Sequence, residues 1–257
     1  MIETGHGQSI LSEFTHQARA FNVSPVMRSA ATLRGLIEFM PFAPDQSWVD
    51  LAAGPGLVSR ALAPHVAVVH AIDLTAAMVE LGRAEAAREG LTNITFALGD
   101  ACALDVRAGS FDGAVTRFSL HHIPFPERCV AEMARVVRSG GHIVIADHVG
   151  SEDRAESLWH ESIERLRDPS HWACLPHARI RALALALGLL PVREKVVPFR
   201  LDFEEWLARG SGAAQSRDLI EEAIRRHPGG VSSFHLSGGR GEREIGLLYS
   251  VSVWRTQ

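Results

Sequence analysis

Residues 48–62 read WVDLAAGPGLVSRAL, an apolar run with an acidic residue near its end, a tight turn containing Gly54 and Gly56, and the start of a helix. Small residues in such a turn let the backbone come close to a ligand and direct the amides of the helix N-terminus at it. A tight strand-to-helix turn also needs glycine for purely structural reasons. The residues around the loop therefore decide what it binds.

From residue 47 onward the chain alternates between short apolar runs, glycine-rich turns and amphipathic helices, a rhythm typical of parallel βαβ units. The expected strands are 47–51, 66–72, 94–98, 113–116, 142–146, 192–199 and 245–254. The expected helices are 58–63, 76–89, 127–137, 151–167, 178–187 and 216–226, with one more that Asp202 and Glu205 begin as a capping box. We further expect two helices in the N-terminal segment, the second starting at Ser24 and Pro25.

No repeat, low-complexity tract or linker interrupts the chain, so we expect one α/β domain over residues 1–257. Its parts are N-terminal cap helices at 9–40, a core at 45–150, a helical lid inserted at 151–175 and a C-terminal part at 176–257. A chain of 257 residues buries enough surface to fold without disulfide or metal staples.

The composition narrows the class of partner. The chain has 26 Lys and Arg against 30 Asp and Glu, a net charge of -4 that offers no basic stripe for nucleic acid. Residues 1–10 lack the basic and apolar regions of a signal peptide, and the most apolar stretch, 183–190, is too short to span a membrane. We therefore expect a cytoplasmic protein with a small-molecule partner and no nucleic-acid or membrane partner, and a homodimer is left open.

The reactive side chains are unevenly represented. Lys195 and Tyr249 are the only lysine and tyrosine, whereas there are 13 histidines, so proton transfer is expected from His, Asp or Glu. Three cysteines, Cys102, Cys129 and Cys174, are odd in number and widely spaced, which favours neither a disulfide framework nor a zinc site.

Carboxylates lie at the C-terminal ends of the first three expected strands or just after them, at Asp50, Asp73 and Asp100. The dinucleotide-binding pattern GxGxxG is incomplete because its third position is Ser59, and Asp50 would repel a pyrophosphate, so NAD is disfavoured. A cationic cosubstrate with a ribose fits better, since Asp73 can accept from ribose hydroxyls and Asp100 from an adenine amino group.

Four ordered blocks then carry a resemblance: VDLAAGPG at 49–56, AIDLTAAMVELGRA at 71–84, FALGDACAL at 96–104 and FDGAVTRFSLHHIPFPERCVAEMARVVRSGGHIVIAD at 111–147. Over residues 14–199 the chain resembles class I S-adenosylmethionine-dependent methyltransferases, in the small-molecule group related to the ubiquinone and menaquinone methyltransferases. The resemblance implies a Rossmann-like seven-stranded sheet of order 3214576 with the last strand antiparallel, and S-adenosylmethionine as cofactor.

The resemblance also implies a set of cofactor-binding residues: Phe14, Phe21, Asp50, Ala52, Gly54, Gly56, Asp73, Leu74, Met78, Asp100, Ala101, Arg117 and Phe118. The chain departs from the family at Ala52, where the family has its first glycine, and at the N-terminal helix, where Phe14 and Phe21 stand in place of a tyrosine.

Histidines supply the candidates for acceptor chemistry. His122 matches by alignment the base of some small-molecule members, and His148 ends the fifth strand at the edge where acceptors bind, so both are catalytic candidates. The substrate-binding candidates are His121, Trp159, His160, His171 and Trp172. Each has an alternative role in packing. No metal site is expected, because the spacing of His142 and His148 comes with no carboxylate or cysteine partner.

Methyl transfer from a sulfonium is an in-line displacement that mainly needs alignment and exclusion of water. The sequence thus favours S-adenosylmethionine-dependent methylation of a small, partly aromatic or apolar acceptor of the secondary-metabolite kind at O, N or C. The alternative is an enzyme of the same fold that binds the cofactor but catalyses cyclisation or dehydration. A regulatory nucleotide-binding module is a third hypothesis.

Overall fold

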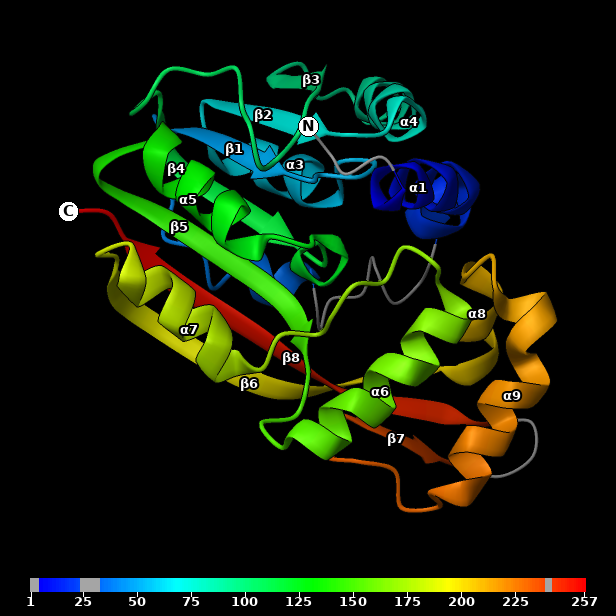
Figure 1. Cartoon of the computed structure of the whole chain (residues 1–257). Coiled ribbons are helices and arrows are strands. Elements are labelled where there is room, and N and C mark those ends of the chain that lie inside the picture. The colour runs from blue at the N-terminus through cyan, green and yellow to red at the C-terminus, as the bar shows by residue number, and fades with distance from the viewer. Residues whose placement is uncertain (1–4, 24–32, 239–241) are drawn as a thin grey trace.

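The computed structural model describes residues 5–23, 33–238 and 242–257. Over these residues it has an eight-stranded sheet with helices on both faces (Figure 1). The strands are β1 (Ser47–Leu51), β2 (Val68–Asp73), β3 (Ile94–Leu98), β4 (Phe111–Arg117), β5 (Val137–Val149), β6 (Leu190–Asp202), β7 (Phe234–Ser237) and β8 (Glu244–Arg255). The helices are α1 (His6–Val23), α2 (Gly35–Ile37), α3 (Leu57–Leu62), α4 (Ala76–Arg88), α5 (Pro126–Val136), α6 (Arg154–Arg167), α7 (His177–Ala186), α8 (Phe203–Arg209) and α9 (Ala213–Arg226), with short 3-10 helices η2 (Ala63–His65) and η3 (Leu120–His122).

The sheet has the order β3-β2-β1-β4-β5-β8-β6, and β8 runs antiparallel to both of its neighbours. With β8 counted as the seventh principal strand, this is the predicted order 3214576 with an antiparallel last strand. The α/β prediction is confirmed. Because β1 to β5 are parallel, their carboxyl ends share one edge of the sheet.

One strand was not predicted. β7 is four residues long and pairs with residues 244–247 of β8. The pairing of β8 with β5 begins at the next residue, Leu248. Along β8, β7 therefore takes the place that β5 occupies beside the rest of that strand. A four-residue strand is too short to show a periodic pattern in sequence.

The two faces of the sheet are covered by different helices. Alternating residues of β4 and β5 point to opposite faces, so Ala114 and Ile143 pack with α5 and α7 while Val115 and Val144 pack on the face of α3. Strand β4 packs tightly against Trp48 of β1, since a Cβ on Gly113 would lie 2.4 Å from the Trp48 ring.

Strand β5 begins earlier than expected. The helix before it ends at Val136, and Gly140 and Gly141, which lie between the predicted helix at 127–137 and the predicted strand at 142–146, are inside the strand. The register with β4 is irregular there and becomes regular from the pairing of Gly113 with His142. The glycines therefore allow a bend in a strand rather than a helix end.

The segment 151–175 forms α6 and the loop that follows it. Asp153 caps α6 by accepting from the backbone N–H groups of Ala155 and Glu156. The helix packs through Ile163 on the same core as Trp206 of α8 and Ile220 of α9. Figure 1 shows these helices with β7 as a layer beside the extended ends of β6 and β8.

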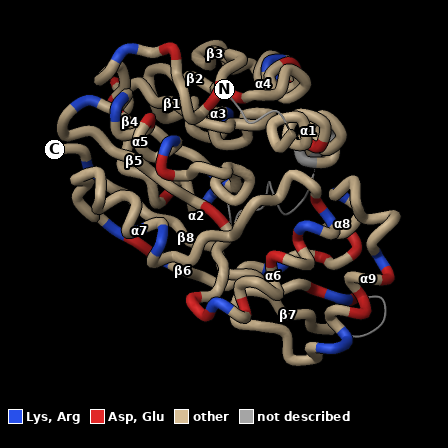
Figure 2. The backbone as a smooth tube through the Cα atoms, viewed as in Figure 1, with Lys and Arg blue, Asp and Glu red and all other residues tan. Residues whose placement is uncertain are grey.

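The predicted second N-terminal helix falls mostly on residues 24–32, which lie outside the described residues; α2 is its described end. In Figure 2, acidic and basic positions are interspersed along α6, α8 and α9. Several of them pair, as Arg217 does with Glu204 at 2.6 Å. Within the described residues, no helix is both long enough and apolar enough to cross a membrane.

Candidate functional site

The loop between β1 and α3 runs through the left-handed backbone region at three positions. Ala52, Gly54 and Gly56 have φ values of 51°, 55° and 71°. A Cβ on Gly54 would touch only Met78 Sδ at 4.0 Å, so Gly54 leaves the adjoining space open. A Cβ on Gly56 would lie 2.7 Å from the ring of Phe96, so this glycine serves packing instead. Ala52 adopts a conformation that costs an L residue about 1–2 kcal/mol.

Asp50 is tied to the first turn of α3. The backbone N–H and the hydroxyl of Ser59 donate to Asp50 Oδ2 at 3.0 and 2.6 Å. Ser59, which stands where the dinucleotide-binding pattern has its third glycine, is therefore the hydrogen-bond partner of Asp50, the carboxylate that would repel a pyrophosphate. Burial raises the pKa of Asp50 to about 7, against the lowering effect of the bonds from Ser59.

Asp73 and Asp100 shape the next two loops. Asp73 accepts from the backbone N–H groups of Gly54 at 2.7 Å and Thr75 at 2.8 Å, so it joins the loops after β1 and β2. Burial raises the pKa of Asp73, against the lowering effect of these bonds. Asp100 accepts from the backbone N–H of Cys102 at 2.8 Å. Each carboxylate keeps lone pairs free of these bonds.

These three carboxylates line one pocket, with a cavity volume of about 180 Å³. Helix α1 contributes His6, Ile10 and Phe14 to its lining. All residues predicted to bind the cofactor line this pocket except two. Gly56 packs against Phe96 as described, and Phe21 lies in α1 with its side chain outside the described part of the structure.

Comparisons with known proteins show which family this chain is similar to. Residues 49–145 match the family model described as a methyltransferase domain. The uncharacterized methyltransferase YcgJ of Bacillus subtilis is 27% identical over 209 residues, which cover 80% of this chain and 82% of that protein. Demethylmenaquinone methyltransferase of Renibacterium salmoninarum is 32% identical over 114 residues, 44% of this chain and 46% of that protein. The crystal structure of B. subtilis YcgJ superposes with a TM-score of 0.79 at 24% identity, covering 89% of this chain and 99% of that one.

The chain is a class I S-adenosylmethionine-dependent methyltransferase.

The residues that line the pocket of this methyltransferase match the chemical groups of its cofactor. S-adenosylmethionine has an adenine, a ribose diol and a cationic methionyl end. The pocket offers acceptors at Asp50, Asp73 and Asp100, and apolar walls at Leu74 and Met78. The missing side chain of Gly54 leaves backbone exposed to the cavity, as a close-lying ligand requires.

Arg117 is the last residue of β4 and Phe118 follows it, and both line the pocket. Phe118 has φ of 53°, a second strained position beside the cavity. The Arg117 guanidinium lies 4.6 Å from the centre of the Phe118 ring, and burial lowers its pKa. Tyr249, on β8, packs its ring 5.1 Å from that of Phe118.

A smaller cavity of about 40 Å³ adjoins the pocket of the methyltransferase. Three residues, Phe14, Phe118 and His122, line both spaces. The smaller cavity is further lined by Phe199 and Trp206, by Gln17 and Leu247, by His121 and His148, and by the charged residues Glu164, Arg167, Asp168 and Arg209.

His122 is held from behind. Its Nδ1 lies 3.0 Å from Ser170 Oγ, and that hydroxyl donates to Asp168 Oδ1 at 2.6 Å. Gln17 donates to the other oxygen of Asp168 at 3.0 Å. Burial lowers the pKa of His122, which favours its neutral form. Burial raises the pKa of Asp168, but His122 and Arg167 outweigh it and hold that pKa well below its usual value.

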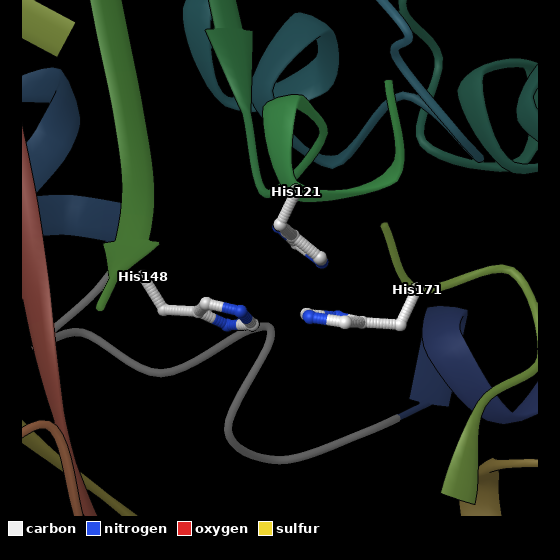
Figure 3. A group of neighbouring side chains, drawn as sticks. All are labelled: His121, His148 and His171. Atoms are coloured by element: carbon white, nitrogen blue, oxygen red, sulfur yellow. The ribbon is translucent and has the colours of Figure 1, made fainter. Parts of the chain in front are cut away.

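The other predicted acceptor residues divide into two groups. His121, His148 and His171 come together in one buried cluster (Figure 3). Trp159, His160 and Trp172 line neither cavity. Trp159 and His160 pack against Phe234, at 5.8 and 5.1 Å between ring centres, because that face of α6 is turned toward the core. Trp172 is 44% exposed and meets the ring of His6.

Sequence reasoning missed the residues that come from the C-terminal part, above all Phe199, Trp206 and Arg209. Arg209 is buried, and burial lowers its pKa to about 10. A basic residue in the last turn of a short helix gives no signal of burial in the sequence. Ser170 and Asp168 follow the helix predicted at 151–167, and only the fold places them next to His122.

Proposed function

We propose that this methyltransferase transfers a methyl group to a small-molecule acceptor that binds between His122 and the aromatic side chains of the smaller cavity. The observation that carries the proposal is the shared wall. Phe14, Phe118 and His122 line both the cofactor pocket and the adjoining cavity, so a molecule in one space meets a molecule in the other at these side chains.

In this proposal the strand-end carboxylates orient the cofactor. Asp73 accepts from the ribose hydroxyls with the lone pairs that Gly54 and Thr75 leave free. Asp100 and Ala101 lie at the adenine, and Asp50 lies at the cationic methionyl end. Helix α1 covers this space and keeps water out.

His122 is the proposed base for an acceptor that starts protonated. The neutral ring is bonded at Nδ1 to Ser170, which leaves Nε2 as the nitrogen that can take a proton. The Ser170 hydroxyl donates a hydrogen bond to Asp168, so both residues act as positioning residues that fix the His122 ring. His6 adds a contact from α1, because its Nε2 lies 2.9 Å from the backbone oxygen of His122.

The lining of the smaller cavity indicates the chemistry of the acceptor. Phe199 and Trp206 supply aromatic surface, and Arg167 and Arg209 supply donors. This combination favours an acceptor with a planar or apolar body and an oxygen-bearing group. The bound cofactor supplies an electrophilic methyl group on a cationic sulfur. The protein aligns the acceptor with it, excludes water and holds the acceptor proton.

The test is the formation of S-adenosylhomocysteine by the full chain with S-adenosylmethionine and a panel of hydroxylated or aminated aromatic and apolar molecules. We expect it to accumulate only when an acceptor is present. His122→Ala should lower kcat by about 100-fold or more with an O-acceptor and leave cofactor affinity unchanged. His70→Ala is the matched control, because His70 lies on β2 and bonds Thr95 away from both cavities.

Two outcomes would overturn the proposal. Transfer to RNA or protein but to no small molecule would contradict the acceptor class. Conversion of a small molecule without S-adenosylhomocysteine formation would favour the alternative, a cyclase or dehydratase that keeps its cofactor intact.

A further inference from the structure

Three histidines from distant parts of the chain meet beside the smaller cavity. His121 lies in η3, His148 near the end of β5 and His171 in the loop after α6, and Figure 3 shows their rings directed toward one another. The ring centre of His121 lies 4.0 Å from that of His148 and 5.7 Å from that of His171. All three side chains are buried, and one ligand nitrogen from each lies within 4.8 Å of the other two.

Carboxylates hold two of these rings from behind. His121 Nδ1 lies 2.7 Å from Asp147 Oδ1, and His171 Nε2 lies 2.6 Å from Glu161 Oε2. Glu161 is itself fixed by the backbone N–H of Cys174, which donates to its other oxygen. A carboxylate that accepts from one ring N–H sets the tautomer and leaves a lone pair on the opposite nitrogen.

Two further ring nitrogens of the cluster have no partner in the described part of the protein. Among the described residues, His148 Nε2 and His171 Nδ1 are buried and have no hydrogen-bond partner. A buried polar atom without a partner costs about 1–3 kcal/mol. Two such atoms in one cluster call for a common partner that accepts lone pairs.

We propose that His121, His148 and His171 bind a divalent transition metal ion, with zinc as the best match, through the ring nitrogens that face one another. Imidazole nitrogen is a ligand that zinc prefers. Carboxylates behind metal-bound histidines are the usual outer partners of such sites. Zinc–nitrogen bonds of about 2.0–2.1 Å put tetrahedral ligands about 3.4 Å apart, and the ligand nitrogens lie within 4.8 Å of one another, so each gap must close by at most about 1.4 Å. Rotation of histidine side chains allows this.

The charge of the surroundings suits a cation. Asp147 is 2% exposed, and its hydrogen bonds come from the ring and backbone of His121 and the backbone of His148. Glu161 lies behind His171 in the same way. A metal held by the rings would place positive charge between these two carboxylates, which the neutral rings alone do not supply.

The position of the site suggests what its fourth ligand is. His121 and His148 also line the smaller cavity. Three protein ligands leave one position for water or for an oxygen of the acceptor. The assignment to an acceptor oxygen rests on the proposed function, whereas metal binding itself does not. The sequence prediction of no metal site considered only spacing along the chain, and His171 is brought in by the loop after α6.

The experiment measures metal binding by the full chain without cofactor or acceptor. The protein is stripped with a chelator, and Zn²⁺ is titrated against a chromophoric competitor. We expect one Zn²⁺ per chain, and with Co²⁺ the intense visible absorption of a four-coordinate site. His148→Gln should weaken Zn²⁺ binding at least about 100-fold, and Asp147→Asn about 10–100-fold.

His177→Gln is the matched control, because it removes an imidazole that bonds Ser250 outside the cluster, and it should bind Zn²⁺ like the wild type. Circular dichroism is recorded for each variant to check that it is folded. A wild-type chain that takes up no stoichiometric Zn²⁺ would overturn the proposal, as would equal loss of binding in His177→Gln and His148→Gln. Neither result bears on whether S-adenosylhomocysteine is formed, so the two proposals fail separately.

Discussion

The pKa of Asp50 predicts how cofactor affinity depends on pH. In the free protein burial raises this pKa to about 7, so Asp50 is largely neutral below that pH and ionised above it. The cofactor carries net positive charge and prefers the ionised carboxylate, so binding expels a proton at lower pH. If only the ionised form binds, Kd rises about tenfold between pH 8 and pH 6 and about tenfold more by pH 5. Above pH 7 affinity should level off.

The assay is isothermal titration with S-adenosylmethionine from pH 5.5 to 8, in two buffers of different ionisation enthalpy so that the expelled protons are counted. Asp50→Asn keeps the size of the side chain and an acceptor for Ser59 but removes the titration. Its Kd should vary much less with pH. The reasoning is refuted if the wild-type Kd is constant over this range, or if Asp50→Asn keeps the full dependence.

Three further predictions test the loops and the positioning of His122. Asp73→Ala should weaken cofactor binding by about 1–3 kcal/mol in a titration, because a charged acceptor is lost; an unchanged Kd would remove Asp73 from the ribose site. Ala52→Gly should stabilise the fold by about 1 kcal/mol and raise the thermal midpoint by about 2–4 °C, since φ is 51° there; Ala53→Gly is the control, and equal shifts would contradict the strain. Ser170→Ala should lower kcat about fivefold at unchanged cofactor affinity, as expected for one positioning hydrogen bond; an unaltered kcat would reduce Ser170 to packing.

The cofactor side of the site could be predicted because local rules place it. Parallel strands end at one edge, so Asp50, Asp73 and Asp100 had to gather there once the βαβ rhythm was recognised. Leu74 and Met78 come soon after Asp73 in the chain, directly after β2 and in the first turn of α4, so they could be predicted at the same edge. Gly56 shows the limit of this reasoning, because whether a loop glycine faces a ligand or a ring such as Phe96 depends on packing.

The acceptor side depends on contacts between distant segments. The pairing of β5 with β8 sets His148 opposite Tyr249, which brings Tyr249 from the last strand against Phe118. The loop after α6 carries both Ser170 to His122 and His171 to the histidine cluster. No periodicity in sequence encodes these approaches. Trp159 was expected in the pocket for its aromatic character, but its face of α6 is the one that packs on the core.

A crystal structure with S-adenosylhomocysteine bound tests the central claim most directly. The account predicts the ribose hydroxyls within hydrogen-bond distance of Asp73, the adenine beside Asp100, and the sulfur facing the wall formed by Phe14, Phe118 and His122. Binding of S-adenosylhomocysteine outside this pocket, or with its sulfur directed away from His122, would contradict it.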